Sequence, residues 1–541
     1  MKKYQLYLLS ILSGILFSIS WPERGFPFLI FFAFIPLLFI ENYISNNKDK
    51  FTKFSIFTYS AIAIFIWNVL TLYWIKNASI FGGAMAVLVN TLFMSCLITI
   101  FHISKRNIHG KNQGYLTFIF FWIAFEYLHL RWEINWPWLT TGNVFALYPK
   151  WIQWYEFTGV LGGSLWILSV NILIYNLLNN LILKEGRKKI IISAVSFLFF
   201  LFVPLIFSYS IYNNYVEEEN PYTVVVVQPN IDPYNEKYGG MPYAVQIEKS
   251  LLLAEQKTDE NTDIVVFPES AIQENNLWER EIEHSFSIDS LRKFINKHPN
   301  IEVVMGASTY KKIFKGENKT YEARQFGNTD LWYYAYNTAM YFDTSSTIQF
   351  YHKSKLVLGV ERLPFPKTFS FLENFALDMG GTVGTLAINK ERTPFVSKKH
   401  PIKIGTTICY ESIYGEFCTG FVKKGANIFF IITNDGWWGN TPGYKQHFSF
   451  APLRAIETRR SIARSANTGT SAFINQKGDV FQATKYWEED VIKQDINANS
   501  KITFYVKYGD YVGRIALLGS VLLLLITIST GIIRKKKEIK N

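Results

Sequence analysis

The chain has 541 residues, a hydrophobic content of 49% and a formal net charge of +12. The average hides a division: long apolar runs dominate residues 1–216, residues 217–508 have the polar loops and short strands of a water-facing domain, and residues 509–541 hold a last apolar run. The composition therefore excludes an entirely soluble chain and predicts an integral membrane protein with one large water-facing domain.

Eight segments free of Asp, Glu, Lys and Arg are candidate membrane spans. A spanning helix needs about 20 apolar residues, so the first, second and fifth segments are short, and an amphipathic or buried helix is the alternative for them. The segments are Tyr4–Trp21, Gly25–Ile40, Phe54–Ile75, Asn77–Ser104, Tyr115–Phe125 and beyond, Phe157–Leu183, Ile190–Tyr212 and Ile515–Ile533.

The basic residues predict the orientation of these spans. Lys and Arg concentrate in loops on the cytoplasmic side of a membrane. The clusters lie at the amino terminus, in every second loop and at the carboxyl terminus: Lys2–Lys3, Lys48–Lys53, Lys105–Lys111, Lys184–Lys189 and Arg534–Lys537. We expect both termini in the cytoplasm and the large domain on the opposite side. Because the charge sits at membrane flanks, nucleic-acid binding is a poor explanation for it.

Short runs of β-branched and aromatic residues recur along residues 217–508 and predict strands. They are "YTVVVVQ", "DIVVFPES", "IEVVMGAS", "NTAMYFD", "TIQFYHKSK", "IKIGTTICYES", "NIFFIITNDG" and "TSAFINQKGD". Helical patterns lie between them, and two begin at Tyr243 ("YAVQIEKSLLLAEQK") and Tyr444 ("YKQHFSFAPLRAIETRRSIARSA"). Strands that alternate with helices predict an α/β layered domain.

Three of the predicted strands end in a residue that can take part in proton or acyl transfer. Glu269 follows "VVFP", Lys353 follows "TIQFYH" and Cys409 follows "IGTTI". Loops at strand ends are where layered α/β folds build active sites, although each residue alone is more often structural. Cys409 could instead pair with Cys418 in an oxidising compartment, which would end its role as a nucleophile. We interpret Cys96 as a small apolar residue within a span.

Four local motifs together carry a family resemblance. "FPES", "YHKSKLV", "ICYES" and "NDGWWG" occur in this order, each after a predicted strand. This arrangement resembles the nitrilase superfamily, which implies an αββα sandwich and a catalytic set of Glu269, Lys353 and Cys409. The predicted fold is therefore a nitrilase-like αββα domain attached to eight transmembrane helices.

The whole chain resembles the apolipoprotein N-acyltransferases, multi-pass enzymes of the bacterial inner membrane with a periplasmic catalytic domain. Further matches are "WPWLTTGN", "VQPNIDP" and "YVKYGDYVGR". Two departures stand out. "LVLGVE", ending at Glu361, replaces the family's Leu-Val-Pro-Phe-Gly-Glu, and only Tyr238 offers a counterpart for a tryptophan in the loop after the first strand.

The resemblance implies transfer of an acyl chain from a membrane phospholipid to the amino terminus of a diacylglyceryl-modified apolipoprotein, without cofactor or metal. A cysteine thioester divides this reaction into two easier steps. Glu269 fits the base, and Lys353 with the backbone N–H of Tyr410 fits the oxyanion donors. The resemblance further assigns Glu361 and Glu411 to orienting Lys353 and the amine. We interpret His447 as structural.

Two other functions stay open. A membrane-anchored amidase of the nitrilase type would use water in place of the amine, although one span would suffice to anchor it. A transporter or receptor with an inactive outer domain would need ionisable residues along its spans. Glu126 is the only clear candidate for such a residue.

Overall fold

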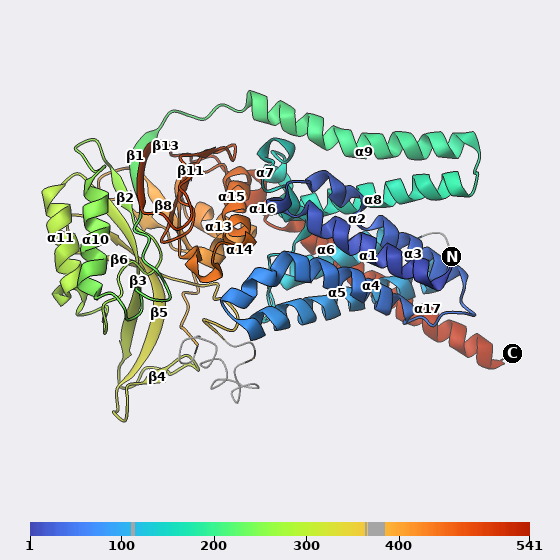
Figure 1. Ribbon diagram of the computed structural model, residues 1–541, viewed down its shortest axis with the longest axis horizontal. Helices are drawn as coiled ribbons and strands as arrows, with labels where there is room; N and C mark the ends of the chain where they lie inside the picture. The colour runs from blue at the N-terminus through green and yellow to red at the C-terminus, as the bar shows by residue number, and fades with distance from the viewer. Residues whose placement is uncertain (110–113, 363–364, 366–384, 541) are drawn as a thin grey trace. The chain divides into compact units, whose positions relative to one another are not determined.

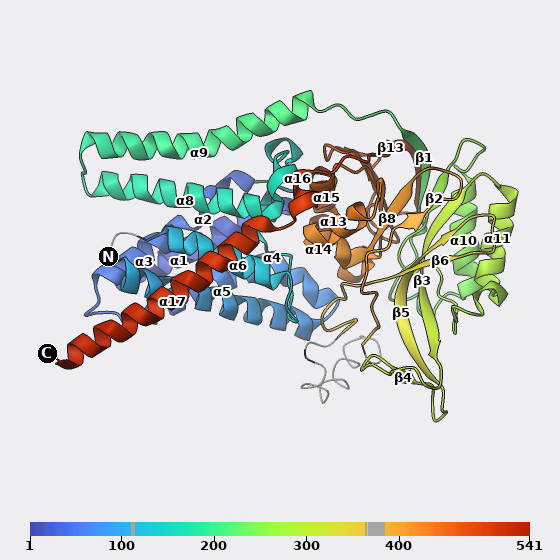
Figure 2. The same ribbon diagram turned by 180° about the vertical axis from the view of Figure 1, so that it is seen from behind.

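The computed structural model describes residues 1–109, 114–362, 365 and 385–540. It divides into two compact units, which the two views of the ribbon diagram show from opposite sides (Figures 1 and 2). The first unit contains Met1–Lys76, Ile80–Asn214 and Tyr508–Asn541. The second contains Asn77–Ser79 and Tyr215–Lys507. The second unit is therefore a single long insertion between apolar helices, apart from one three-residue segment.

The first unit is built from apolar helices. Within the described residues, seven helical segments are long and apolar enough to cross a membrane. They are α1 (Lys3–Ser20), α2 with α3 (Ile30–Ala33 and Ile35–Asn46), α4 (Ser55–Leu72), α5 (Ile80–Ile108), α8 (Val160–Ile182), α9 (Arg187–Asn214) and α17 (Tyr511–Lys540). The short helix α7 (Tyr155–Thr158) precedes α8.

The fifth predicted span corresponds to α6 (Leu116–His129), which has only 14 residues. Such a helix is about 21 Å long, shorter than the ~30 Å hydrocarbon core of a bilayer. The membrane-embedded helical fold is confirmed, with seven candidate spans. The eighth span stays a prediction.

A proline interrupts α9, and a neighbouring helix compensates for it. Pro204 has no N–H, so the carbonyl of Phe200, one turn earlier, lacks its usual helical donor. Trp166 in α8 donates its indole N–H to that carbonyl at 2.8 Å. The bond joins α8 to α9, which lie side by side in Figures 1 and 2.

A charged cluster is buried among the membrane helices. Glu41 in α3 accepts hydrogen bonds from Lys105 (2.5 Å) and contacts His102 Nδ1 (2.8 Å), both in α5. Lys105 also donates to the hydroxyl of Tyr115 at 3.0 Å. The assignment of Lys105 to a basic loop is therefore wrong: the carboxylate of Glu41 provides a counter-charge within the helical interior. Lys111, from the same predicted cluster, lies outside the described residues.

Glu126 is also buried, but it is not the only ionisable residue within the helices, as the cluster around Glu41 shows. Its Oε1 accepts from the indole of Trp122 and from both the backbone N–H and the hydroxyl of Thr141, at 2.8 to 2.9 Å. Glu126 thus ties α6 to the loop that follows it.

The second unit contains two sheets. In the first, the strand order is β13-β1-β2-β3-β5-β4, with β6 also paired to β5; in the second it is β12-β11-β10-β9-β8-β7. The first sheet uses β1 (Pro221–Gln228), β2 (Ile264–Val266), β3 (Glu302–Ile313), β4 (Arg324–Gln325), β5 (Trp332–Phe342), β6 (Gln349–His352) and β13 (Asp490–Asn497). The second uses β7 (Phe395–Val396), β8 (Lys403–Ile408), β9 (Ile428–Thr433), β10 (Ile462–Ala466), β11 (Ala472–Ile474) and β12 (Val480–Phe481).

Helices cover the outer faces of both sheets. Helices α10 (Tyr243–Glu255) and α11 (Phe286–Lys297) lie on the first sheet, as Figure 1 shows, and their apolar residues share one buried cluster with β1, β2 and β3. Helices α13 (Gly415–Lys423) and α15 (Ala451–Thr458) pack against each other beside the second sheet. The sheets meet through β1 and β10, where Ser465 donates to the carbonyl of Val227 at 2.8 Å. The predicted αββα sandwich is confirmed.

The predicted helix from Tyr444 is correct only in its first part. The segment forms α14 (Pro442–Ser449) and α15, and its last residues form strand β10. Arg459 adopts a φ of +51°, which ends α15 and turns the chain into the sheet. The strand and helix predictions at Tyr243, Glu269, Lys353 and Cys409 agree with the structure. A further short helix, α16 (Phe504–Tyr508), precedes α17.

Candidate active site

Glu269, Lys353 and Cys409 converge from the ends of three strands. Glu269 follows β2, Lys353 follows β6 directly, and Cys409 follows β8 directly. Two of these strands belong to the first sheet and one to the second, so the site forms where the two sheets meet. All three side chains are buried, with exposed fractions of 6%, 1% and 9%. The structure therefore brings Glu269, Lys353 and Cys409 together, each at the strand end where the sequence predicted it.

Lys353 lies between two carboxylates. Its Nζ is 3.1 Å from Glu269 Oε1 and 2.8 Å from Glu361 Oε1. Asn337 in β5 donates its amide N–H groups to the same two oxygens, at 2.7 and 3.1 Å. The second oxygen of Glu269 accepts the backbone N–H of Asn434 at 3.0 Å. One ammonium and two amide donors thus hold a pair of acids in fixed orientations.

The charges act on one another strongly because the site is dry. Burial would lower the pKa of Lys353, but Glu269 and Glu361 raise it well above its usual value. Burial raises the pKa of the Cys409 thiol, and Glu269 raises it further, while Lys353 lowers it. The raised pKa disfavours the thiolate, which is the nucleophilic form, so a neighbouring group that takes the proton would promote attack.

A second lysine contacts the backbone of the acid. Lys237, in the loop after β1, is 2% exposed, and its Nζ donates to the carbonyl of Glu269 at 3.2 Å. Burial lowers the pKa of Lys237 to about 7, against the effect of the Glu269 charge. No pattern in the sequence marked this lysine, because it stands alone in a polar loop.

Glu411 contacts backbone groups rather than the ammonium of Lys353. Its Oε1 accepts from the N–H of Ser354 (2.6 Å) and the hydroxyl of Tyr351 (2.8 Å), and its Oε2 accepts from the N–H of Ile408 (2.9 Å). Glu411 therefore joins the chain next to Lys353 to the chain next to Cys409. Of the two glutamates expected to orient Lys353, only Glu361 contacts its side chain.

The loop that carries Glu361 places its carboxylate beside Lys353 with the sequence Leu-Val-Leu-Gly-Val-Glu. Gly359 adopts a φ of +83°, which allows a tight turn. Val357 donates its N–H to Glu361 Oε2 at 2.8 Å, and Glu361 donates its own N–H to the carbonyl of Val357 at 2.9 Å. These reciprocal bonds fix the carboxylate beside Lys353.

The nucleophile candidate sits on a sharp turn. Cys409 has a φ of +50°, the left-handed region that non-glycine residues rarely adopt. Its carbonyl accepts the hydroxyl of Ser412 at 2.8 Å. Cys96, Cys409 and Cys418 are all free thiols, so the disulfide between Cys409 and Cys418 is not formed. Tyr410 is buried directly after the cysteine, and its ring packs on Tyr414.

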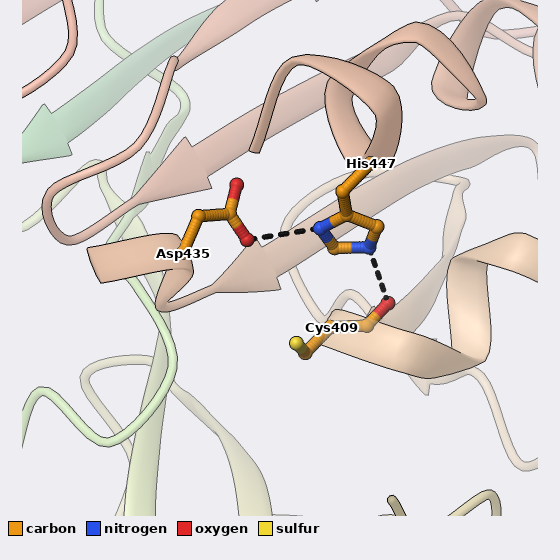
Figure 3. A group of neighbouring side chains, drawn as sticks. All are labelled: Cys409, Asp435 and His447. Carbon is orange, nitrogen blue, oxygen red and sulfur yellow. Dashed lines mark hydrogen bonds and ion pairs between the residues drawn. The ribbon is translucent and has the colours of Figure 1, made fainter. Parts of the chain in front are cut away.

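Asp435 and His447 lie next to Cys409, as Figure 3 shows. His447 Nδ1 is 2.9 Å from Asp435 Oδ1, and its Nε2 is 3.2 Å from the carbonyl oxygen of Cys409 rather than directed at the sulfur. Arg464 donates to Asp435 Oδ2 at 2.6 Å. Burial would raise the pKa of Asp435, but Arg464 and His447 hold it below its usual value.

These three residues could offer a thiol, a carboxylate and an imidazole to a metal ion. Both ring nitrogens and both carboxylate oxygens are instead engaged in the contacts above, and the guanidinium of Arg464 adds a positive charge that would repel a cation. We therefore interpret the group as a hydrogen-bonded support of the turn at Cys409. The interpretation of His447 as merely structural overlooked this contact, because Asp435 and His447 meet only in the folded chain.

Aromatic side chains border the site. Tyr238 stacks on Trp437 with ring centroids 5.6 Å apart, and Tyr234 meets the same ring edge-on at 5.3 Å. Within "NDGWWG", Asp435 and Gly436 are buried, whereas Trp437 is partly exposed. The motif therefore combines a packed turn with a more open aromatic end.

Two family profiles match the chain. The profile of the carbon-nitrogen hydrolases matches residues 223–502, and that of the apolipoprotein N-acyltransferase N-terminal domain matches residues 13–173. The first covers nearly all of the two-sheet unit that holds the site, and the second covers most of the apolar helices.

Similar proteins extend over almost the full length. An apolipoprotein N-acyltransferase of Chlorobaculum tepidum is 29% identical over 94% of this chain and 94% of its own. Apolipoprotein N-acyltransferase 1 of Treponema denticola is 26% identical over 98% of each chain. Among solved structures, Nit3 of Saccharomyces cerevisiae, a member of branch 10 of the nitrilase superfamily, is 17% identical with a TM-score of 0.36, covering 51% of this chain and 90% of its own.

Proposed function

The chain belongs to the apolipoprotein N-acyltransferases, membrane enzymes of the carbon-nitrogen hydrolase family, and we propose that it moves an acyl chain from a phospholipid to a lipoprotein through a thioester on Cys409. The observation that carries the proposal is the convergence of Glu269, Lys353 and Cys409 in one buried site. An acid, a cation and a thiol are the groups that thioester chemistry needs.

In the first half-reaction, the carboxylate of Glu269 takes the proton of the Cys409 thiol. The thiolate attacks the ester carbonyl carbon of the phospholipid, and a tetrahedral oxyanion forms. The ammonium of Lys353 and the backbone N–H of Tyr410 stabilise this oxyanion. The bond from the carbonyl carbon to the glycerol oxygen then breaks, Glu269 returns the proton to that oxygen, and a lysophospholipid leaves the thioester behind.

In the second half-reaction, the neutral α-amino group of a diacylglyceryl-modified cysteine attacks the thioester carbonyl. Glu269 takes a proton from the attacking nitrogen, and the same two donors hold the second oxyanion. The carbon–sulfur bond breaks, the amide leaves with the lipoprotein, and the proton on Glu269 returns to the thiolate. Glu361 keeps Lys353 in place during both steps, and Glu411 keeps the backbone next to Lys353 and next to Cys409 in register.

A site for lipid substrates must lie at a membrane surface, because a diacyl phospholipid is almost absent from water. We propose a bacterial inner membrane, with both termini in the cytoplasm and the domain in the periplasm. The alternation of basic clusters along the loops supports this orientation. The proposal includes α6 as the eighth span, because four spans between Lys48–Lys53 and Lys184–Lys189 are needed to place both clusters on the same side. The amidase alternative needs the same residues, but it leaves the long apolar helices without a role in catalysis.

The test uses the full-length protein in lipid nanodiscs with a phospholipid radiolabelled in its acyl chain. We expect label on the protein that neutral hydroxylamine removes, and its transfer to a diacylated lipopeptide added afterwards. Cys409→Ser should carry no hydroxylamine-sensitive label, whereas Cys418→Ser, which changes the other free thiol of the domain, should behave as wild type. The proposal fails if Cys409→Ser still acylates the peptide. Release of free fatty acid without acylated peptide would favour the amidase.

A further inference from the structure

We propose that His447 is a positioning residue that orients the oxyanion donor of Tyr410, an inference that rests on the proposed function. The two residues do not need to touch. The carbonyl of Cys409 and the N–H of Tyr410 belong to one peptide unit, which is planar and holds these two groups on opposite sides. Whatever fixes the direction of the carbonyl of Cys409 therefore fixes the direction of the Tyr410 N–H.

Two side chains hold that carbonyl. His447 Nε2 lies 3.2 Å from the oxygen, and the hydroxyl of Ser412 donates to it at 2.8 Å. His447 is 1% exposed and Ser412 is 3% exposed, so both contacts are shielded from bulk solvent. The two donors approach the same oxygen from α14 and from the turn after β8.

Asp435 fixes the imidazole ring from the other side. Its Oδ1 is 2.9 Å from His447 Nδ1, while its Oδ2 is held by Arg464 and its Oδ1 also accepts the hydroxyl of Thr433 at 2.7 Å. A carboxylate and a carbonyl oxygen can only accept hydrogen bonds. The contact with the carbonyl of Cys409 is therefore a hydrogen bond when Nε2 carries the hydrogen, and Asp435 and Arg464, which both lie beside Nδ1, hold the ring in the orientation that this contact needs.

The contacts lie next to an unusual backbone conformation. Cys409 is held at a φ of +50°, a region that non-glycine residues rarely adopt. Without the contacts to its carbonyl, the peptide unit after Cys409 would be free to turn about the Cα–C bond, which moves the carbonyl and the next N–H but not the Cβ or the sulfur. That rotation turns the N–H of Tyr410 away from the oxyanion, whereas the position of the sulfur depends on the preceding strand β8.

The inference predicts that loss of His447 affects one reaction of the Cys409 thiol and spares another. Acyl transfer passes through an oxyanion and needs the N–H of Tyr410. Alkylation by iodoacetamide occurs at a saturated carbon and forms no oxyanion, so it reports only the placement and ionisation of the thiol. A residue that acts through the peptide unit should change the first rate and not the second.

The experiment uses full-length protein carrying Cys96→Ser and Cys418→Ser, so that Cys409 is its single thiol. In nanodiscs we expect His447→Ala to slow thioester formation from labelled phospholipid roughly 10- to 100-fold, less than the ~10²–10³ that follows loss of a whole oxyanion donor. The KM for the lipid and the rate of alkylation by iodoacetamide should stay within about threefold of the parent. His447→Gln retains an N–H donor and should recover most of the lost rate.

A matched control and a second variant complete the test. His400 faces Asp263 at 3.4 Å near the opposite ends of strands β8 and β2, so His400→Ala removes the same chemical pair away from the site and should leave both rates unchanged. Ser412→Ala removes the other donor to the same carbonyl and should reproduce the selective loss, even if His447→Ala does not fold.

Each outcome decides the inference. A selective loss of acylation in His447→Ala supports it, as does the same loss in Ser412→Ala where His447→Ala does not fold. An equal loss of acylation and alkylation, or no loss of either, overturns it while the proposed function stands. If the parent forms no hydroxylamine-sensitive thioester, the proposed function fails first and the role of His447 fails with it.

Discussion

The backbone of Glu269 lies against Gly306 with no room for a side chain between them. A Cβ on Gly306 would lie 2.7 Å from the Cα of Glu269 and 2.6 Å from the N of Ser270. Gly306 belongs to β3, the strand next to β2, and its N–H and carbonyl bind the turn that carries the acid. The position of Glu269, the candidate base, therefore depends on residue 306 of the neighbouring strand having no side chain.

Gly306→Ala should therefore reduce acyl transfer without removing any catalytic group. A displacement of about 1 Å at a reacting group costs up to roughly 10²-fold in rate, and we expect a loss of about 10- to 100-fold in thioester formation. The matched control is Gly186→Ala, because a Cβ there meets no atom within 4 Å. Equal rates for Gly306→Ala and wild type would show that the turn at Glu269 tolerates the added carbon.

Lys353→Met should be both inactive and less stable. The substitution leaves Glu269 and Glu361 buried together without their shared cation, and breaking a buried ion pair costs about 3–5 kcal/mol. Loss of one oxyanion donor should lower the rate of thioester formation by about 10²–10³. Scanning fluorimetry and the labelled-lipid assay measure the two effects. Lys355→Met is the control, because Lys355 extends over the ring of Tyr414 instead; normal melting of Lys353→Met would contradict the shared-cation arrangement.

Glu411 should make stability depend on pH. Burial raises the pKa of Glu411 to about 7 from an ordinary value of 4.5, although its hydrogen bonds oppose this. The folded state therefore binds a proton more tightly than the unfolded state, so this contribution to stability is full below about pH 4.5 and is lost as the pH rises toward 7. The melting temperature of wild type relative to Glu411→Gln should fall across this range. A difference that stays constant with pH would show that Glu411 keeps its charge in the folded protein.

The buried ion pair of the helical unit should behave as a coupled pair. Glu41→Gln or Lys105→Met alone leaves one charge without its partner, and each should lower stability by about 3–5 kcal/mol. The double variant Glu41→Gln with Lys105→Met removes both charges and should be more stable than either single variant. Thermal melting in detergent checks this cycle. Strictly additive losses would mean that the two residues act independently.

All three cysteines should react with a thiol reagent after denaturation without reductant. Cys418 lies in α13 and is free, as are Cys96 and Cys409. Mass spectrometry of protein denatured with excess iodoacetamide should therefore show three added groups. A product lacking two of them would mean that a disulfide had formed in the cell.

The residues at strand ends were the predictable part of the site. Glu269, Lys353 and Cys409 each follow a run of β-branched residues, so their positions could be read from local pattern, and their order matched a known family. Asn337 could not be found in this way, because it lies inside strand β5 and reaches the two acids only through sheet pairing. Asp435 and His447 share this property, since their contact with Cys409 requires three separate elements to fold together.

The helical unit shows a different limit. The length of each apolar run predicted where the helices lie. It did not predict which charged residues form ion pairs between those helices. Glu41 ends one predicted span and Lys105 begins a predicted loop, and each is an ordinary flanking residue by sequence alone. The end of α6 is a similar case, because the charge-free run from Tyr115 stops at Phe125, whereas the helix continues to His129 and includes Glu126.

The domain that carries Cys409 is continuous with an apolar helix at each of its ends, α9 before Tyr215 and α17 after Lys507. Such double attachment tethers the domain to the membrane that the helices cross, and the proposed phospholipid donor belongs to the same membrane. Encounters then occur in two dimensions. The acylation rate should follow the mole fraction of donor lipid in the membrane and remain constant when vesicles of fixed composition are diluted in buffer.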